Sequence, residues 1–314
     1  MGKLVNGVWH DVWYDTANSG GKFIREDAGF RDWIRDEPDA QFTPDSGRYH
    51  LYVSLACPWA HRTLIFRQLK GLEPHIDISI VSPDMLSDGW QFPCPEPLHS
   101  ANFLHQVYTH AKRDYTGRVT VPVLWDTHTQ TIVSNESSEI IRMFNSAFDR
   151  LTGNDDDYYP QALREQIDSW NEFIYPNINN GVYRCGFATT QSAYEEAYHQ
   201  LFSALDRIEH HLGESRYLVG EHITEADWRL FTTLIRFDSV YVGHFKCNKQ
   251  RIEDYVALNG YMKELYQYRK VALTTNFEHI KRHYYFSHTG INPTQVVPVG
   301  PELDLLSPHG REQL

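Results

Sequence analysis

The sequence predicts an α/β domain followed by an all-helical domain. The chain has 314 residues, and at about 150 residues per domain this length accommodates two domains. Strand-like alternation and short helical stretches are mixed between residues 48 and 152, whereas apolar residues recur with a helical period between residues 161 and 287. An acidic stretch at residues 154–157 separates the two patterns. Strands mixed with helices, followed by helices alone, indicate an α/β plus all-α architecture.

Composition and charge limit the classes of function. The chain has 29 Lys+Arg against 41 Asp+Glu and a formal net charge of −12, whereas nucleic-acid surfaces need clustered basic charge. No apolar run approaches the ~20 residues that span a bilayer, and the N-terminus has neither an export nor an import pattern. Four cysteines in so long a chain do not indicate a disulfide framework. We therefore expect a soluble cytoplasmic protein without nucleic-acid or membrane partners.

Residues 1–47 contain no long periodic segment. Their aromatic side chains are nevertheless frequent: Trp9, Trp13, Phe23, Phe30 and Trp33. A flexible tail would not need these rings, because disordered segments are poor in aromatics. We expect residues 1–47 to form an extended arm packed on the body of the protein.

The first domain, residues 48–152, starts with a strand that leads into a helix. Pro58 stands at the first helical position, where its missing N–H costs nothing, and Gly71 ends the helix. The other elements that we expect are strands at 49–53, 76–81, 119–125 and 131–133, a polar insertion at 83–117 and a helix at 137–148. This order indicates a small mixed sheet with helices on its faces.

The second domain, residues 161–287, is helical in period throughout. A short apolar stripe runs through residues 163–174, and a longer one runs through residues 194–212. Thr224 is a good N-cap for a further helix, since Asp227 can reach back to it as in a capping box. The last segment, residues 288–314, contains four prolines and little periodicity. We expect it to be a tail packed on the surface.

Cys57 carries the sharpest chemical signal. It stands where a strand ends and a helix begins, and the positive end of the helix dipole lowers the pKa of a thiol there. Such a thiol is a nucleophile near neutral pH. Ala60 occupies the partner position of a C-x-x-C pair, so an external thiol must resolve a mixed disulfide at Cys57, and glutathione is the obvious supplier in a reducing cytosol. The alternative is an inert cysteine at a helix start.

Two weaker signals follow along the chain. A cis bond before Pro122 would turn the Val121 backbone outward to pair with a peptide-like ligand, while an edge-strand proline is the alternative. Glu136 and Ser137 open the next helix, whose N–H groups suit a ligand carboxylate, and Glu136 suits a ligand ammonium; ordinary capping is the alternative. Together with Cys57, these places meet the requirements of a tripeptide site. The thiolate would meet the thiol of the ligand, the Val121 backbone would pair with the middle of the tripeptide, and the helix end would bind a carboxylate.

These motifs resemble those of cysteine-type glutathione transferases: Cys57-Pro58-Trp59-Ala60, Thr120-Val121-Pro122, Glu136-Ser137 and the capping box from Thr224 to Asp227. The stretches at residues 48–52, 181–184 and 283–293 narrow the resemblance to the Xi class, the glutathionyl-hydroquinone reductases. It covers nearly the whole chain. It implies a thioredoxin-like N-terminal domain, an all-helical glutathione-transferase C-terminal domain and a homodimer. It also implies reduction of glutathionyl-hydroquinones to hydroquinones with glutathione as co-substrate, without a metal or a nucleotide.

By motif position, the resemblance also implies roles for individual residues. Cys57 would be the nucleophile, and Tyr183 would donate a proton in the quinone pocket. Tyr241 and Tyr284 match tyrosines that hydrogen-bond the thiolate, with Tyr285 as the other choice of register. The residues implied to bind glutathione are Trp90, which packs on it, Arg118, Val119, Thr120 and Val121, which line it, and Glu136 and Ser137, which hold its γ-glutamyl end.

Other functions share parts of this pattern. An omega-type thiol transferase or dehydroascorbate reductase also uses Cys-Pro and glutathione, but the arm, the 181–184 motif and the tail count against it. A non-catalytic binding module with the transferase fold would often lose the reactive cysteine, which this chain keeps. Conjugation is least favoured, because a cysteine traps glutathione as a disulfide. The 17 histidines show no H-E-x-x-H spacing, so we expect no metal site.

Overall fold

The computed structural model describes residues 2–314, and the chain divides into two compact units. Unit 1 contains the chain up to Trp13, Glu26–Asp156 and Thr274–Thr289. Unit 2 contains Tyr14–Arg25, Asp157–Leu273 and Gly290–Leu314. Each unit therefore draws on the N-terminal 47 residues and on residues close to the C-terminus.

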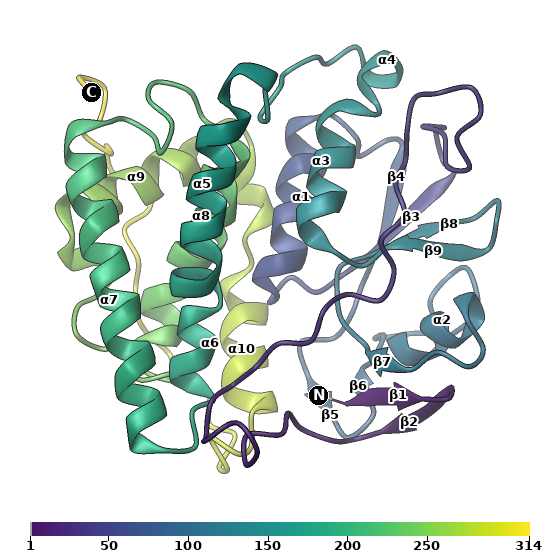
Figure 1. The fold of residues 1–314 in the computed structure, drawn as a ribbon, viewed down its shortest axis with the longest axis horizontal. Helices are drawn as coiled ribbons and strands as arrows, with labels where there is room; N and C mark the ends of the chain where they lie inside the picture. The colour runs from purple at the N-terminus through teal and green to yellow at the C-terminus, as the bar shows by residue number, and fades with distance from the viewer. Residues whose placement is uncertain (1) are drawn as a thin grey trace. The chain divides into compact units, whose positions relative to one another are not determined.

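A mixed four-stranded sheet forms the centre of unit 1 (Figure 1). Its strands, in the order β4-β3-β8-β9, are β4 (Ile76–Ile80), β3 (Tyr49–Val53), β8 (Val123–Asp126) and β9 (Thr131–Ser134). The pairing of β3 with β4 is parallel, and its pairing with β8 is antiparallel. Every residue of β3 is buried, as expected for a strand at the centre of a sheet covered by helices. The mixed sheet predicted from the sequence is confirmed.

The helices of unit 1 are α1 (Pro58–Leu69), α2 (Leu104–Ala111), α3 (Ser137–Ser146), α4 (Asp149–Thr152) and α10 (Phe277–Ser287). Helix α1 starts at Pro58, with Cys57 as its N-cap residue, and the chain leaves it through Gly71 at φ +66°. That positive φ suits glycine, which has no Cβ to clash. Helices α1 and α3 lie side by side (Figure 1). Both ends of α1 are where the sequence predicts them.

For residues 83–125, one expectation is incomplete and one is wrong. The polar insertion contains α2, whose buried positions Leu104, Val107 and Tyr108 follow the helical i, i+3, i+4 spacing. It also contains β5 (Met85–Leu86), β6 (Gly89–Trp90) and β7 (Gly117–Arg118). The predicted strand at 119–125 begins only at Val123, after a proline that has no N–H for a ladder. The Val121-Pro122 bond is cis, which is the first of the two alternatives that the sequence leaves open.

The N-terminal segment begins with a hairpin that our expectation of a plain extended arm missed. Strands β1 (Lys3–Val5) and β2 (Val8–His10) pair antiparallel, and β1 also pairs with β7 (Figure 1). Asn6 and Gly7 have φ of 49° and 76°. Positive φ at both central residues is typical of a two-residue type I′ turn, for which Asn-Gly is the preferred sequence. This dipeptide was the signal in the sequence.

Unit 2 is helical. Its elements are η1 (Gln161–Leu163), α5 (Arg164–Ile174), η2 (Tyr175–Asn179), α6 (Gly181–Gly186), α7 (Gln191–Glu214), α8 (Glu225–Arg236), η3 (Phe237–Tyr241), η4 (Ile252–Asp254), α9 (Val256–Gln267) and η5 (Val271–Thr274), whose last residue belongs to unit 1. The capping box at the start of α8 is confirmed: the Asp227 carboxylate accepts from Thr224 N at 2.7 Å. Arg311 is buried and donates to the carbonyls of Leu212, Ser215 and Arg216.

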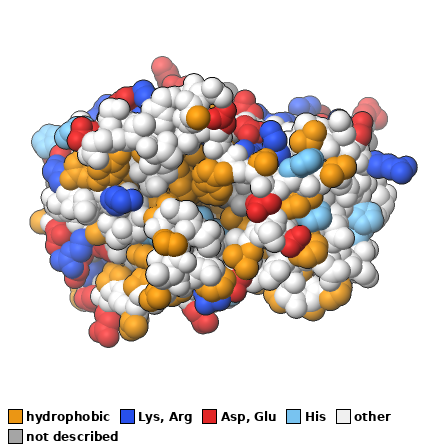
Figure 2. Space-filling model, turned by 90° about the horizontal axis from the view of Figure 1, so that it is seen from below, with side chains coloured by type: hydrophobic (Ala, Val, Ile, Leu, Met, Phe, Trp, Pro, Cys, Tyr) orange, Lys and Arg blue, Asp and Glu red, His pale blue; other side chains and the backbone are white. Residues whose placement is uncertain are grey.

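One face of the molecule mixes charges of both signs. On the face that Figure 2 shows, Lys and Arg side chains are interspersed with Asp and Glu side chains. Within residues 2–314, the helices are all too short or too polar to cross a membrane.

A buried ion pair joins β3 to β8. Arg48 directly precedes β3, and its Nε and Nη2 donate to the two carboxylate oxygens of Asp126 at 2.8 and 2.9 Å. Asp126 is fully buried at the end of β8. The guanidinium also donates to Thr43 Oγ1, Asp45 Oδ2 and the Gln41 carbonyl, so one cation ties the two strands to the segment before them. A bidentate geometry of this kind fixes orientation as well as charge.

Asp126→Asn should destabilise the protein in a pH-dependent way. Removing one member of a buried pair strands the other charge, so we expect a loss of about 3 kcal/mol in the free energy of unfolding near pH 7. Burial acts to raise the pKa of Asp126, but hydrogen bonds from Arg48 and Thr129 outweigh it and hold this pKa below its usual value. The stabilisation is therefore complete above about pH 4 and disappears as the pH falls through the native pKa.

Urea unfolding measured between neutral and acidic pH tests this expectation. The difference in the free energy of unfolding between wild type and Asp126→Asn should become smaller as the pH falls. Asp77→Asn on β4 is the matched control, since Asp77 is exposed on the neighbouring strand. A gap that stays constant down to acidic pH would show that the ion pair is not what Asp126 contributes.

Candidate active site

Cys57 lies at the junction of β3 and α1, half-buried, with its sulfur close to Val121. Its Sγ is 3.6 Å from the Val121 carbonyl oxygen. The Cys57 carbonyl accepts the first hydrogen bond of the helix, from His61 N at 2.9 Å, and the residue itself is extended at φ −77° and ψ 124°. The thiol therefore lies at a helix N-terminus, where backbone N–H groups and the helix dipole favour a thiolate.

The segment before Pro122 is held by a buried tyrosine that the sequence analysis missed. Tyr108 of α2 donates its hydroxyl to the Thr120 carbonyl at 2.8 Å and accepts from Thr120 N at 3.2 Å. Asn135 Nδ2 also donates to this hydroxyl, at 3.0 Å. Burial raises the pKa of Tyr108, so the hydroxyl stays protonated and can serve as donor and acceptor at once. Tyr108 thus fixes the backbone next to Val121.

The side chain of Arg118 is engaged with the N-terminal segment. Its Nη1 and Nη2 donate to the carbonyls of Val12 and Trp13 at 2.6 and 3.2 Å, and its Nε donates to Glu26 at 3.0 Å. These partners flank residues 14–25, the part of the arm that belongs to unit 2. Arg118 therefore binds the chain on both sides of residues 14–25.

The start of α3 presents Glu136 and Ser137 as a capped helix end. Glu136 is the N-cap residue, and its Oε1 accepts from Ser138 N at 2.9 Å and from Ser138 Oγ at 2.7 Å. Ser137 is buried, and its hydroxyl accepts from Arg62 Nη1 at 3.4 Å. Glu136 thus caps α3 in the way that the alternative interpretation describes. The helix start is also the kind of place that binds carboxylates.

Trp90 and Tyr284 belong to one aromatic cluster in unit 1. The Trp90 ring stacks on His283 with centroids 4.7 Å apart, and His283 contacts the edge of Tyr284 at 5.3 Å. Tyr284 is only 1% exposed, and its ring also meets His288. Both histidines belong to the 283–293 stretch of the resemblance, which implies no role for either of them.

Tyr183 and Tyr241 lie together in unit 2. Tyr183 is on α6 and Tyr241 ends η3, and their ring centroids are 6.2 Å apart. Tyr183 also packs against three phenylalanines: Phe23, Phe187 and Phe245. Both tyrosines are buried, Tyr241 completely. The predicted site residues are thus divided, with Tyr183 and Tyr241 in unit 2 and the others in unit 1.

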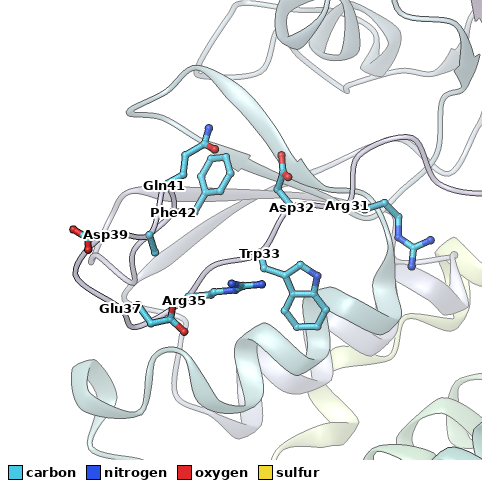
Figure 3. A pocket seen from close by; sticks show the side chains of 9 residues that line it. Arg31, Asp32, Trp33, Arg35, Glu37, Asp39, Gln41 and Phe42 are labelled. Atoms are coloured by element: carbon cyan, nitrogen blue, oxygen red, sulfur yellow. The ribbon is translucent and has the colours of Figure 1, made fainter.

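A hollow of about 470 Å³ lies on the N-terminal segment of unit 1 (Figure 3). Its lining is Arg31, Asp32, Trp33, Arg35, Glu37, Asp39, Ala40, Gln41 and Phe42. None of the predicted site residues is among them. Over residues 2–314, no group of three or more His, Cys, Asp or Glu side chains is arranged to hold a metal ion.

Comparison with known proteins points to one family. The model of the glutathione S-transferase N-terminal domain matches residues 56–147, and that of the C-terminal domain matches residues 191–264. The chain is 55% identical to the glutathionyl-hydroquinone reductase YqjG of Escherichia coli, with 99% of each covered. It is 52% identical to the glutathionyl-hydroquinone reductase PcpF of Sphingobium chlorophenolicum, with 96% of each covered.

Solved structures agree with this relationship over the whole length. The glutathione-bound structure of YqjG matches with a TM-score of 0.90 at 52% identity, over 99% of each chain. A Xi-class transferase from Natrialba magadii matches with a TM-score of 0.93 at 47% identity, over 100% of this chain and 97% of that one.

Cys57 should be the most reactive thiol of the native protein. Cys185 and Cys247 are buried, Cys94 is exposed and Cys57 is half-buried at a helix start. At about pH 6, where an ordinary thiol with a pKa of about 8.5 is almost fully protonated, we expect iodoacetamide to modify Cys57 well before Cys94. Peptide mass spectrometry over a time course measures the order.

The Cys57→Ser variant is the control, and it should lose the fast phase while the slow one remains. If Cys94 reacts first, exposure alone sets the order of reaction, and the helix start does not activate Cys57. If Cys185 or Cys247 reacts without denaturant, the burial of these two thiols is not maintained in solution.

Proposed function

Because the chain belongs to the Xi class of glutathione transferases, the glutathionyl-hydroquinone reductases, we propose that it reduces glutathionyl-hydroquinones to hydroquinones with glutathione as reductant. The observation that carries the proposal is the half-buried thiol of Cys57 at the start of α1, 3.6 Å from the Val121 carbonyl. It offers a nucleophile next to a backbone segment of the kind that pairs with a peptide-like co-substrate.

The glutathionyl part of the substrate is assigned to residues of unit 1. The backbone at Val121 supplies a rung for the middle of the tripeptide, and its position is fixed through Thr120 by Tyr108. The start of α3 at Glu136 and Ser137 receives the γ-glutamyl end, where helix N–H groups suit a carboxylate. Trp90, already stacked on His283, packs on the bound tripeptide.

The first half-reaction cleaves the carbon–sulfur bond of the substrate. The Cys57 thiolate attacks the glutathionyl sulfur, a sulfur–sulfur bond forms, and the electron pair of the broken bond goes to the aromatic carbon. That carbon leaves only if it receives a proton, and Tyr183 is the proposed donor. Positioned proton transfer of this kind contributes about 10²–10⁴-fold in rate. The products are the hydroquinone and a Cys57–glutathione disulfide.

The second half-reaction regenerates the thiolate. A second glutathione, as its thiolate, attacks the glutathionyl sulfur of the disulfide, and Cys57 leaves as a thiolate. The two glutathione units end as oxidised glutathione, and their two electrons have reduced the aryl thioether. Tyr241 and Tyr284 are proposed to hydrogen-bond the thiolate and so favour its charged form.

The cytoplasmic location and the homodimer stay predictions.

Cys57→Ala should abolish release of hydroquinone from a glutathionyl-hydroquinone in the presence of glutathione. The reaction has no other nucleophile in this proposal, so the loss should be at least about 10²-fold. Chromatography of the free hydroquinone measures it, with Cys94→Ala as the control that keeps wild-type rates. Activity on dehydroascorbate or mixed disulfides alone would favour the omega-type alternative, and inactivity on every substrate would leave only a binding module.

Tyr108→Phe should weaken the use of glutathione without removing the chemistry. The variant leaves Thr120 N and the Asn135 amide without their shared acceptor, and losing a buried hydrogen bond of about 1 kcal/mol corresponds to about fivefold. We expect the KM for glutathione to rise by about that factor while kcat changes less than about twofold.

Tyr52→Phe is the matched control for Tyr108→Phe. It removes one buried tyrosine hydroxyl in the same unit, from a hydrogen bond to Glu96. Equal KM values for the two variants would mean that Tyr108 stabilises the unit without supporting the glutathione segment. Steady-state rates over a range of glutathione concentrations distinguish these results.

A further inference from the structure

An arginine of the N-terminal arm lies against the proposed proton donor. Residues 14–25 belong to unit 2, where the Arg25 guanidinium carbon is 4.9 Å from the centroid of the Tyr183 ring. The same guanidinium lies 5.3 Å from the Phe23 ring. Its Nε donates to Asn180 Oδ1 at 3.1 Å, and Asn180 directly precedes the helix α6 that carries Tyr183. The cation is thus held over the ring from the start of the same helix.

We propose that Arg25 is a positioning residue that strengthens Tyr183 as a proton donor. The inference rests on the proposed function, in which Tyr183 protonates the leaving carbon. A cation near an aromatic face is attracted to the electron density of the ring, and a phenolate ring carries more of it than a neutral phenol. Arg25 therefore stabilises the product of proton donation more than its starting state, and the tyrosine becomes the stronger acid.

The surroundings of Tyr183 enhance the influence of that charge. Phe23, Phe187 and Phe245 pack around the ring, and Tyr183 as a whole is only 7% exposed. A charge acts more strongly where apolar side chains exclude water.

The other titratable groups described near Tyr183 either are not cations or bind other side chains. Tyr241, whose ring centroid is 6.2 Å away, has a phenol and no cationic group. Arg184, next in α6, donates to Gln200 of α7 at 2.8 Å and pairs with Glu196 at 3.7 Å. Cys185, also on α6, is a buried thiol. Arg25, in contrast, is a cation that lies against the face of the Tyr183 ring.

The loop that carries Arg25 is itself well fixed in unit 2. Thr189 N donates to the Gly21 carbonyl at 3.0 Å, and Thr190 Oγ1 donates to the Gly20 carbonyl at 3.1 Å. Gly21 has φ +86°, and a Cβ there would lie 2.5 Å from Thr190 Oγ1. This close approach keeps the loop on the segment between α6 and α7. Arg25 is consequently held by its loop as well as by Asn180.

Charge removal and charge retention at position 25 test the proposal. Arg25→Gln removes the cation, and Arg25→Lys keeps it in a different shape. Single-turnover release of hydroquinone, followed against pH, isolates the step that Tyr183 serves. We expect Arg25→Gln to slow this step about threefold to tenfold at neutral pH and to move its basic limb upward by about one pH unit. Arg25→Lys should lie between Arg25→Gln and wild type.

Two controls separate this effect from a loss of structure. Arg207→Gln removes another guanidinium of unit 2 that lies over aromatic rings, those of Trp170 and Phe173, and it should leave the pH profile unchanged. In a Tyr183→Phe background, Arg25→Gln should have no further effect on the rate. An equal slowing in that background, or a slower rate with an unmoved basic limb, would overturn the proposal.

A titration that needs no activity distinguishes this inference from the proposed function. Carbon-13 NMR of ring-labelled tyrosine follows the ionisation of Tyr183, whose resonance is the one lost in Tyr183→Phe. Its midpoint should rise by about one pH unit in Arg25→Gln, as expected for removal of a neighbouring opposite charge. An unmoved midpoint would refute the role of Arg25 even in an active enzyme. A shifted midpoint in a protein that releases no hydroquinone would support Arg25 while refuting the proposed function.

Discussion

The buried pair of Arg48 and Asp126 sets the register on which the thiol site depends. Arg48 stands at the start of β3, which leads to Cys57, and Asp126 ends β8, which follows the segment containing Val121. With Tyr49 opposite Asp126, the antiparallel ladder is fixed, and a slip by one residue would turn every side chain of β8 to the other face. The separation of 3.6 Å between Cys57 Sγ and the Val121 carbonyl follows from that register.

The residues assigned to the reaction are distributed over both units, and the N-terminal segment belongs to both. Unit 1 supplies the thiol and the residues proposed for glutathione, while unit 2 supplies Tyr183. Residues 14–25 bring Arg25 to Tyr183 within unit 2, and the residues on either side of them are bound by Arg118 in unit 1. The arm is therefore part of the proposed chemistry, which its aromatic composition alone did not reveal.

Local sequence patterns predict the elements whose structure depends on interactions between neighbouring residues. The strand 49–53, the proline start of α1 and the capping box of Thr224 each follow from a few adjacent residues. The residues around Pro122 leave two alternatives open, and the cis bond is the one that the structure has. Helix α2 was missed because its apolar stripe is short and lies among polar residues. Contacts between residues far apart in the chain produce no periodic pattern in the sequence. Examples are the hydrogen bonds of Tyr108 to Thr120 and Asn135 and the contact of Arg25 with Tyr183. Tyr183 itself, one of 19 tyrosines, was singled out by resemblance.

The contacts of Arg118 have a consequence for chain entropy. Its guanidinium holds the chain at Trp13 and again at Glu26, so the residues between them form a loop with both ends fixed. Closing a loop restricts the conformations that its residues can sample. Arg25 is thus offered to its partners at a high effective concentration, as in a tethered ligand. A single side chain in the sheet region thereby lowers the entropic cost of ordering a segment in the helical unit.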